Sequence, residues 1–143
     1  MGRDITLEAV LPHPVDAVWE ALTDPAALAD WLMPVEEFAP VVGQRFRFRA
    51  KPMPGWDGVV GCEVLAVEPL QRLVIRWQGS RMRTPTTVTW TLTPVEAGTR
   101  LRIDHQGFEG IGGLLLAAMH RSGWGSMTRR RLPAHLRDRL AAR

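Results

Sequence analysis

The sequence predicts an α+β domain in which a curved antiparallel sheet of about six or seven strands wraps round a long C-terminal helix. Three observations lead to this fold class. Residues 5–32 read as a strand followed by two short helices, residues 44–105 read almost entirely as strands, and residues from 114 onward read as helix. The strands have one apolar face, and the long helix is the only remaining element that can cover it.

The first part of the chain carries clear local signals. Alternating apolar residues from Ile5 to Leu11 predict a half-buried strand. Pro14 suits the first turn of a helix, and Asp24 followed by Pro25 is a strong start signal for a second short helix that ends near Trp31. The first helix presents apolar residues at helical spacing, namely Val15, Val18, Trp19 and Leu22.

The middle of the chain predicts an antiparallel meander. Phe46 and Phe48 alternate with arginines, and residues 59–67 and 73–77 read as two further strands. The clearest hairpin joins residues 87–93 to residues 101–105. Its turn is Glu96-Ala97-Gly98, where glycine can adopt a positive φ.

The segment from Leu114 onward predicts the covering helix. Gly123 and Gly125 weaken it by about 1 kcal/mol each, and Pro133 should kink it or start a separate final helix near Leu132. The residues expected to face the sheet are Leu115, Leu116, Met119, Trp124, Met127, Leu132, Leu136 and Leu140. A sheet curved round such a helix leaves an internal space, which is a common position for an apolar ligand.

Composition favours one domain, residues 1–143, in a cytoplasmic protein. The chain is 45% hydrophobic and 23% charged, with a net charge of +3. No apolar run reaches the roughly 20 residues of a membrane span, and the N-terminus does not resemble a secretory signal. Cys62 is the only cysteine, so no intrachain disulfide can form. The arginine-rich end lacks a basic-aromatic motif, so no nucleic-acid partner is expected.

No motif for a cofactor or a metal is expected from this sequence. Gly110-Ile111-Gly112-Gly113 lacks the third glycine of a dinucleotide fingerprint and the Lys-Ser/Thr of a phosphate-binding loop, so a hinge or a cavity lid is expected there. The four histidines show no metal-ligand spacing; they are His13, His105, His120 and His135.

Several segments then resemble one family, in order along the chain. Residues 14–25 are similar to its opening helix, residues 63–69 and 72–77 to its central hairpin, and residues 88–90 and 99–108 to its last two strands. Trp31 and the Gly123-Trp124 pair also match. The chain thus resembles the START-like, helix-grip domains of the SRPBCC superfamily, and more narrowly the family named after the heat-shock protein 90 ATPase activator. Gly125 and Pro133 depart from the smooth final helix of that family.

The resemblance implies a helix-grip fold that binds lipids, polyketides or other apolar molecules. His105 ends the apolar series Leu101 and Ile103, so its side chain should point inward. It could orient a ligand, act as a general acid or base, or be a buried histidine satisfied by the backbone, Cys62 or Glu63. The candidate ligand-binding residues are Phe48, Trp77, Trp90, His105, Met119 and Trp124. No catalytic residue is assigned.

We therefore expect a domain that binds a hydrophobic or aromatic small molecule between sheet and C-terminal helix. Two alternatives stay open. A cyclase or dehydratase would use the same cavity and would need at least two titratable polar groups converging inside it. Glu63 or Arg76 within hydrogen-bonding reach of His105 would favour this alternative. A chaperone-associated interaction domain would need an exposed apolar patch. An enzyme is the less favoured of the readings, and the ligand, the pathway and the formation of a homodimer are left open.

Overall fold

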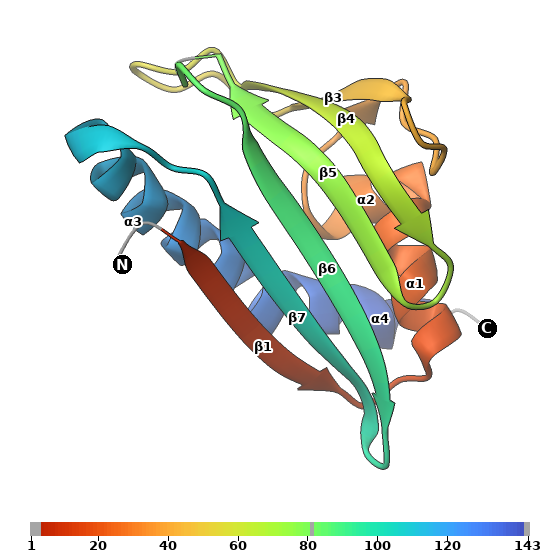
Figure 1. Ribbon diagram of the computed structural model, residues 1–143. Coiled ribbons are helices and arrows are strands. Elements are labelled where there is room, and N and C mark those ends of the chain that lie inside the picture. The colour runs from red at the N-terminus through yellow and green to blue at the C-terminus, as the bar shows by residue number, and fades with distance from the viewer. Residues whose placement is uncertain (1–3, 81, 142–143) are drawn as a thin grey trace.

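The computed structural model describes residues 4–80 and 82–141, and its main feature is a seven-stranded antiparallel sheet (Figure 1). The strands are β1 (Ile5–Leu11), β2 (Val35–Glu36), β3 (Arg45–Arg49), β4 (Val59–Glu68), β5 (Arg72–Gly79), β6 (Thr86–Val95) and β7 (Gly98–Gln106). Their order across the sheet is β1-β7-β6-β5-β4-β3-β2. The α+β fold class is confirmed.

The helices lie on one side of this sheet (Figure 1). They are α1 (Val15–Thr23), α2 (Pro25–Trp31), α3 (Gly110–Ser126), the π-helix η1 (Met127–Arg131) and α4 (Leu132–Ala141). The backbone keeps right-handed helical angles at Met127 and Leu132, so α3, η1 and α4 form one continuous helical run. None of the helices among the described residues is long and apolar enough to cross a bilayer.

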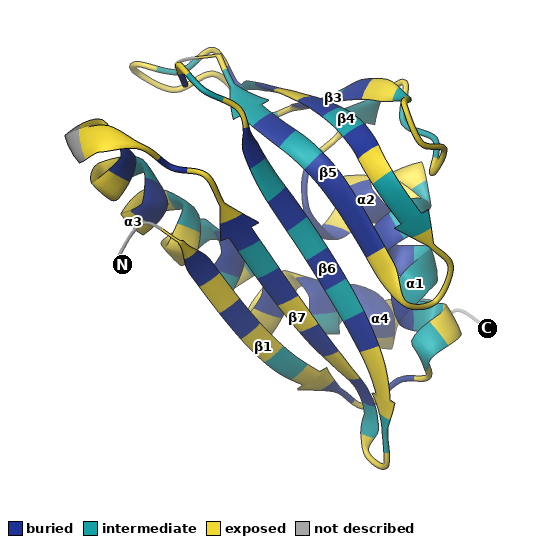
Figure 2. Cartoon of the chain, viewed as in Figure 1, coloured by how far each residue is buried: buried dark blue, intermediate teal, exposed yellow. Residues whose placement is uncertain are grey.

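Alternating burial along the strands separates an inner from an outer face (Figure 2). On β6, Val88, Trp90 and Leu92 are buried, and the intervening threonines are less so. The register places Trp90 opposite Ile103 and Val88 opposite His105. Since cross-strand partners share a face, these side chains form one inner layer beneath the long helix.

The predicted start of the chain is confirmed. The carboxylate of Asp24 accepts a hydrogen bond from the backbone N–H of Ala27 over 3.2 Å, which caps α2. The indole N–H of Trp31 donates to the carbonyl of Ala21 over 2.8 Å and ties the end of α2 to α1. The hairpin glycine, Gly98, has a φ of 141° as the turn prediction required.

The long helix continues through Gly125 and Pro133, the two residues at which the sequence suggested an interruption. Its turn widens in η1, where the N–H of Leu132 bonds to the carbonyl of Met127. Pro133 follows directly, and a proline has no N–H to contribute to a regular turn. The helix also begins at Gly110, four residues before the predicted Leu114.

Three residues that were predicted to face the sheet lie on the outside of the long helix. The exposed fractions of Leu115, Met119 and Leu140 are 66%, 58% and 63%. The inward positions of α3 are taken by small or polar-aromatic residues, among them Gly113, Ala117 and Trp124. The prediction was wrong because apolar residues occur on every side of this segment, so periodicity does not select a face.

Candidate functional site

Five of the six predicted ligand-binding residues meet in one cluster of rings. The ring centroid of Trp77 lies 5.6 Å from Phe48, 5.3 Å from Trp124 and 5.7 Å from His105. Trp90 packs edge-on against Trp124 at 5.7 Å. All five side chains are buried, so the space between the sheet and the middle of the long helix is filled with aromatic groups.

Met119 is the predicted ligand-binding residue that the structure does not bring to this cluster. Its side chain is 58% exposed and lies on the outer face of α3. Its neighbour His120 takes the inward position instead, with its ring centroid 5.1 Å from that of His105. Met119 is therefore not among the candidate contacts of a ligand in this cluster.

His105 is fully buried and both of its ring nitrogens have partners. The indole N–H of Trp124 lies 3.0 Å from Nδ1, and Thr86 Oγ1 lies 2.7 Å from Nε2. An indole nitrogen can only donate, so Nδ1 accepts and the single proton of the neutral ring is on Nε2. Burial and, to a lesser extent, the nearby His120 together lower the pKa of His105 to about 3.

His120, which lies on α3 one turn before Trp124, also accepts a hydrogen bond from a tryptophan. The indole N–H of Trp77 donates to its Nε2 over 3.2 Å, so its proton is on Nδ1, which donates to the carbonyl of Leu116 over 2.8 Å. Burial lowers the pKa of His120, although the backbone bond to Leu116 raises it in part. The two histidines are therefore neutral acceptors for two tryptophans, which join the helix to the sheet.

A cavity of about 600 Å³ adjoins this cluster at the start of α3. Met82, Thr86, Phe108 and Leu116 contribute to its wall. The ring of Phe108 also packs against that of His105, with centroids 4.6 Å apart and planes tilted by 51°, so the cavity reaches the aromatic cluster. Its volume is within the range of small-molecule sites, about 300–1,000 Å³.

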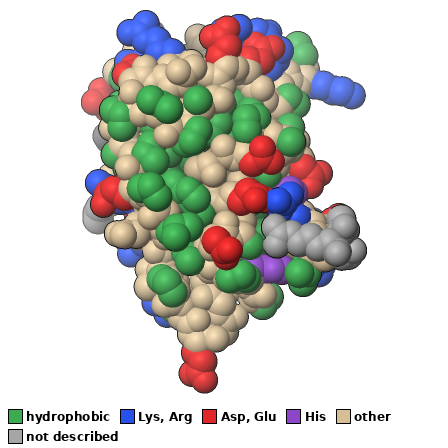
Figure 3. Space-filling view, turned by 90° about the vertical axis from the view of Figure 1, so that its right-hand side faces the viewer, with side chains coloured by type: hydrophobic (Ala, Val, Ile, Leu, Met, Phe, Trp, Pro, Cys, Tyr) green, Lys and Arg blue, Asp and Glu red, His purple; other side chains and the backbone are tan. Residues whose placement is uncertain are grey.

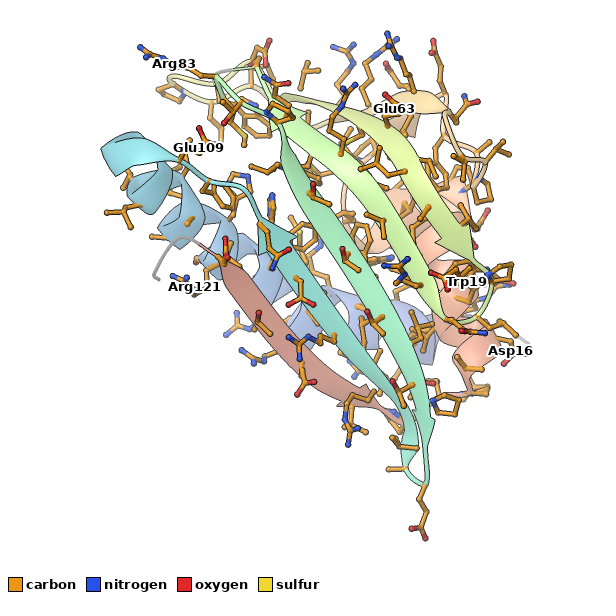
Figure 4. All side chains as sticks on the ribbon, viewed as in Figure 1. Asp16, Trp19, Glu63, Arg83, Glu109 and Arg121 are labelled. Carbon is orange, nitrogen blue, oxygen red and sulfur yellow. The ribbon has the colours of Figure 1, made fainter. Side chains whose placement is uncertain are left out.

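Polar groups at the cavity come from two segments. Figure 4 shows Arg83 on the loop before β6 and Glu109 just before α3, at the same end of the molecule. Both side chains line the cavity and both are exposed. Thr86 is the buried polar group of the lining, at 2% exposure.

A second hollow, of about 450 Å³, has a different character. Several of its lining residues belong to the outer face of the sheet, among them Arg47, Gly61 and Arg76. The arginines there are paired, Arg47 with Glu36 and Arg76 with Glu63. It therefore resembles a charged surface depression more than a site for an apolar ligand.

Neither Glu63 nor Arg76 lies on the face of the sheet that carries His105. Glu63 and Arg76 pair with each other at 3.1 Å and lie between inward-facing residues on their strands, hence on the outer face. Cys62 faces inward and is buried, and burial raises the pKa of its thiol. Within residues 4–80 and 82–141, no three His, Cys, Asp or Glu side chains are grouped to hold a metal ion.

Thr86, Phe108 and His120 are the residues of this site that the sequence did not single out. The sequence did contain a signal for Thr86, because it stands two residues before Val88 and four before Trp90 and so shares their face of the strand. The sequence contained no such signal for His120, because its partner Trp77 lies 43 residues away.

Comparison with known proteins agrees with this fold. A family model described as Activator of Hsp90 ATPase homolog 1-like protein matches residues 12–137. The structure of protein MLL2253 from Mesorhizobium loti is 36% identical, with a TM-score of 0.82 over 95% of this chain and 97% of that one. BH1534 from Bacillus halodurans, at 24% identity, shares the fold with a TM-score of 0.76 over 93% of this chain and 96% of its own.

A further similar structure is longer. DynU16, from the dynemicin biosynthetic locus, is 30% identical with a TM-score of 0.78. The alignment covers 94% of this chain and 47% of DynU16, so the present chain spans about half of that protein. No match was found among curated proteins.

Proposed function

The chain belongs to the family of Activator of Hsp90 ATPase homolog 1-like proteins and has their START-like fold, and on this basis we propose that it binds a hydrophobic or aromatic small molecule. The observation that carries the proposal is the cavity of about 600 Å³ at the start of α3. Affinity would come from apolar burial against Phe108, Leu116 and Met82, at roughly 25 cal/mol per Å² removed from water.

The position of the ligand is more specific than the sequence suggested. Because rings fill the space beneath the middle of the long helix, we place the ligand nearer the amino end of α3. The aromatic cluster then forms the inner wall, through Phe108 and its contact with His105. The similarity to a protein of a biosynthetic locus supports a role with small molecules.

The cyclase or dehydratase alternative receives less support. Acid–base catalysis needs a group that can release or accept a proton near neutral pH. The proton of His105 is held on Nε2 against Thr86, and its pKa is lowered to about 3. Glu63 and Arg76 are on the other face of the sheet. The titratable side chain that does lie beside His105, that of His120, is itself neutral and hydrogen-bonded at both ring nitrogens.

Exposed apolar side chains favour an interaction domain as the second candidate. Figure 3 shows hydrophobic side chains gathered over part of the face that carries α1 and the β4–β5 turn. Leu65 and Leu70, each 42% exposed, belong to β4 and that turn. Size-exclusion chromatography with light scattering would test this candidate, since replacing both leucines by serine should change the mass of any assembly that uses this surface.

The binding proposal is tested with a purely apolar probe, 2-methylnaphthalene, and a matched pair of variants. Leu116 lines the cavity, whereas its neighbour Leu115 is 66% exposed. Leu116→Phe fills the cavity and should weaken binding at least fivefold in isothermal titration calorimetry. Leu115→Phe adds the same ring outside and should change the dissociation constant less than twofold. Absence of binding, or equal effects of the two variants, would contradict the proposal.

A further inference from the structure

We propose that Thr86 is the polar contact of the bound ligand, that it acts only as a hydrogen-bond acceptor, and that the ligand is therefore an apolar molecule carrying an O–H or N–H donor. This inference rests on the proposed function and specifies its ligand class. It assigns His105 a different role from the one expected. His105 is a positioning residue that acts through Thr86.

A hydrogen bond from the long helix fixes the proton of His105. The indole of Trp124 can only donate, so Nδ1 of His105 carries no proton and accepts over 3.0 Å. The neutral ring therefore holds its proton on Nε2. That proton lies on the line to Thr86 Oγ1, at a nitrogen–oxygen distance of 2.7 Å.

A hydrogen bond within the sheet requires the same proton position. Thr86 Oγ1 lies 2.7 Å from the backbone carbonyl of Trp77, and a carbonyl oxygen can only accept. The one hydroxyl proton of Thr86 is thus committed to Trp77. The hydroxyl of Thr86 must therefore accept from Nε2 of His105, the nitrogen that Trp124 leaves protonated.

These two hydrogen bonds determine which hydrogen-bonding capacity the Thr86 hydroxyl retains for a ligand. A hydroxyl has one proton and two lone pairs, and the proton and one lone pair are already engaged. One lone pair remains, so an acceptor is all that Thr86 can present. Its side chain is on the inner face of β6 and contributes to the wall of the cavity together with Phe108 and Leu116.

The consequence is selectivity for one kind of polar group. A ligand hydroxyl or amine can donate to the remaining lone pair of Thr86. At Thr86, a ligand with only a carbonyl oxygen would place two acceptors against each other, so neither gains a hydrogen bond there.

The test compares 2-naphthol with 2-methylnaphthalene, which differ by a hydroxyl in place of a methyl of similar size. The wild-type protein should bind 2-naphthol about five to ten times more tightly in calorimetry. Thr86→Val should abolish this preference, and Thr86→Ser, which restores the hydroxyl, should keep it. The acceptor-only probe 2-naphthaldehyde should bind no more tightly than 2-methylnaphthalene.

Each other outcome is informative. Equal binding of the two probes by wild type, or a preference that survives in Thr86→Val, overturns the inference and leaves the binding proposal intact. If neither probe binds, the proposed function fails and the inference fails with it. Because Thr86→Val could disturb folding, long-range ¹H–¹⁵N spectra of the wild type provide a second test. They should show His105 protonated on Nε2, and protonation on Nδ1 would overturn the inference.

Discussion

The indole N–H of Trp124 donates a buried hydrogen bond to Nδ1 of His105 over 3.0 Å. Trp124 comes from the long helix and His105 from β7, so this bond joins the helix to the sheet. It also fixes which nitrogen of His105 carries the proton, and through that proton it orients the hydroxyl of Thr86. Stability and the proposed ligand preference therefore depend on one contact.

A pair of Trp→Phe variants isolates the free energy of this bond. The indole N–H of Trp90 is buried without a partner, whereas that of Trp124 has one. Both substitutions remove a similar volume, but Trp124→Phe alone leaves a buried acceptor unpaired. We expect Trp124→Phe to lower the free energy of unfolding by about 1–3 kcal/mol more than Trp90→Phe in urea titrations. Equal losses would argue that the bond contributes nothing.

The lowered pKa of His105 makes stability depend on pH. In the unfolded chain the group titrates near 6.5, and in the folded protein near 3. Below pH 6.5 the unfolded state takes up a proton that the folded state does not bind, so stability falls as the pH falls towards 3. Between about pH 7.5 and 5.0 the loss from His105 should be about 2 kcal/mol, and His120 adds to it.

Urea titrations at the two pH values measure this loss. The control is His105→Gln, whose amide can still donate to Thr86 but does not titrate. In His105→Gln, the fall in the free energy of unfolding over the same pH interval should be smaller by the amount that His105 contributes. A wild-type stability that is the same at both pH values would refute the assignment of a neutral, buried histidine.

Glycines of α3 provide a test of how the helix packs. At Gly123 an added Cβ would meet nothing within 4 Å, whereas at Gly113 it would lie 3.0 Å from the backbone carbon of Phe108. Gly123→Ala should therefore raise the free energy of unfolding by about 0.5–1 kcal/mol through helix propensity. Gly113→Ala should lower it, and the melting temperatures of the two variants should move in opposite directions. If both variants were stabilised, α3 would not approach Phe108 as described.

Cys62 should be unreactive in the folded protein. Its side chain is 4% exposed, and burial raises the pKa of its thiol, so little thiolate is accessible at neutral pH. We expect Ellman's reagent to label Cys62 only at the rate of unfolding. Rapid stoichiometric labelling of the native protein would show that the inner layer of the sheet opens readily.

The sequence predicted those features that depend on short-range patterns. The cap at Asp24 acts on residues three positions away, so α2 could be placed from local signals alone. The strict alternation along β6 and β7 likewise placed Trp90 and His105 on the inner face, because strand side chains alternate with a period of two.

Other features depend on contacts between distant residues, and the sequence did not reveal them. Residues 114–119 are apolar on all sides, so the outward position of Met119 follows only from the contacts that His120 and Trp124 make with the sheet. The proton positions on His105 and His120 follow from indoles brought to them by the fold. The cavity was predicted beside the helix, but its location at the start of α3 results from the rings that fill the remaining space.

The central claim, that an apolar ligand occupies the cavity at the start of α3, is tested most directly by nuclear magnetic resonance. Uniformly ¹⁵N-labelled protein would be titrated with 2-methylnaphthalene and the amide shifts mapped on the structure. We expect the largest shifts at residues that line the cavity, namely Thr86, Phe108, Gly113 and Leu116. Shifts centred instead on Gly61 and Gln78 of the outer hollow, or no shifts at saturating probe, would contradict it.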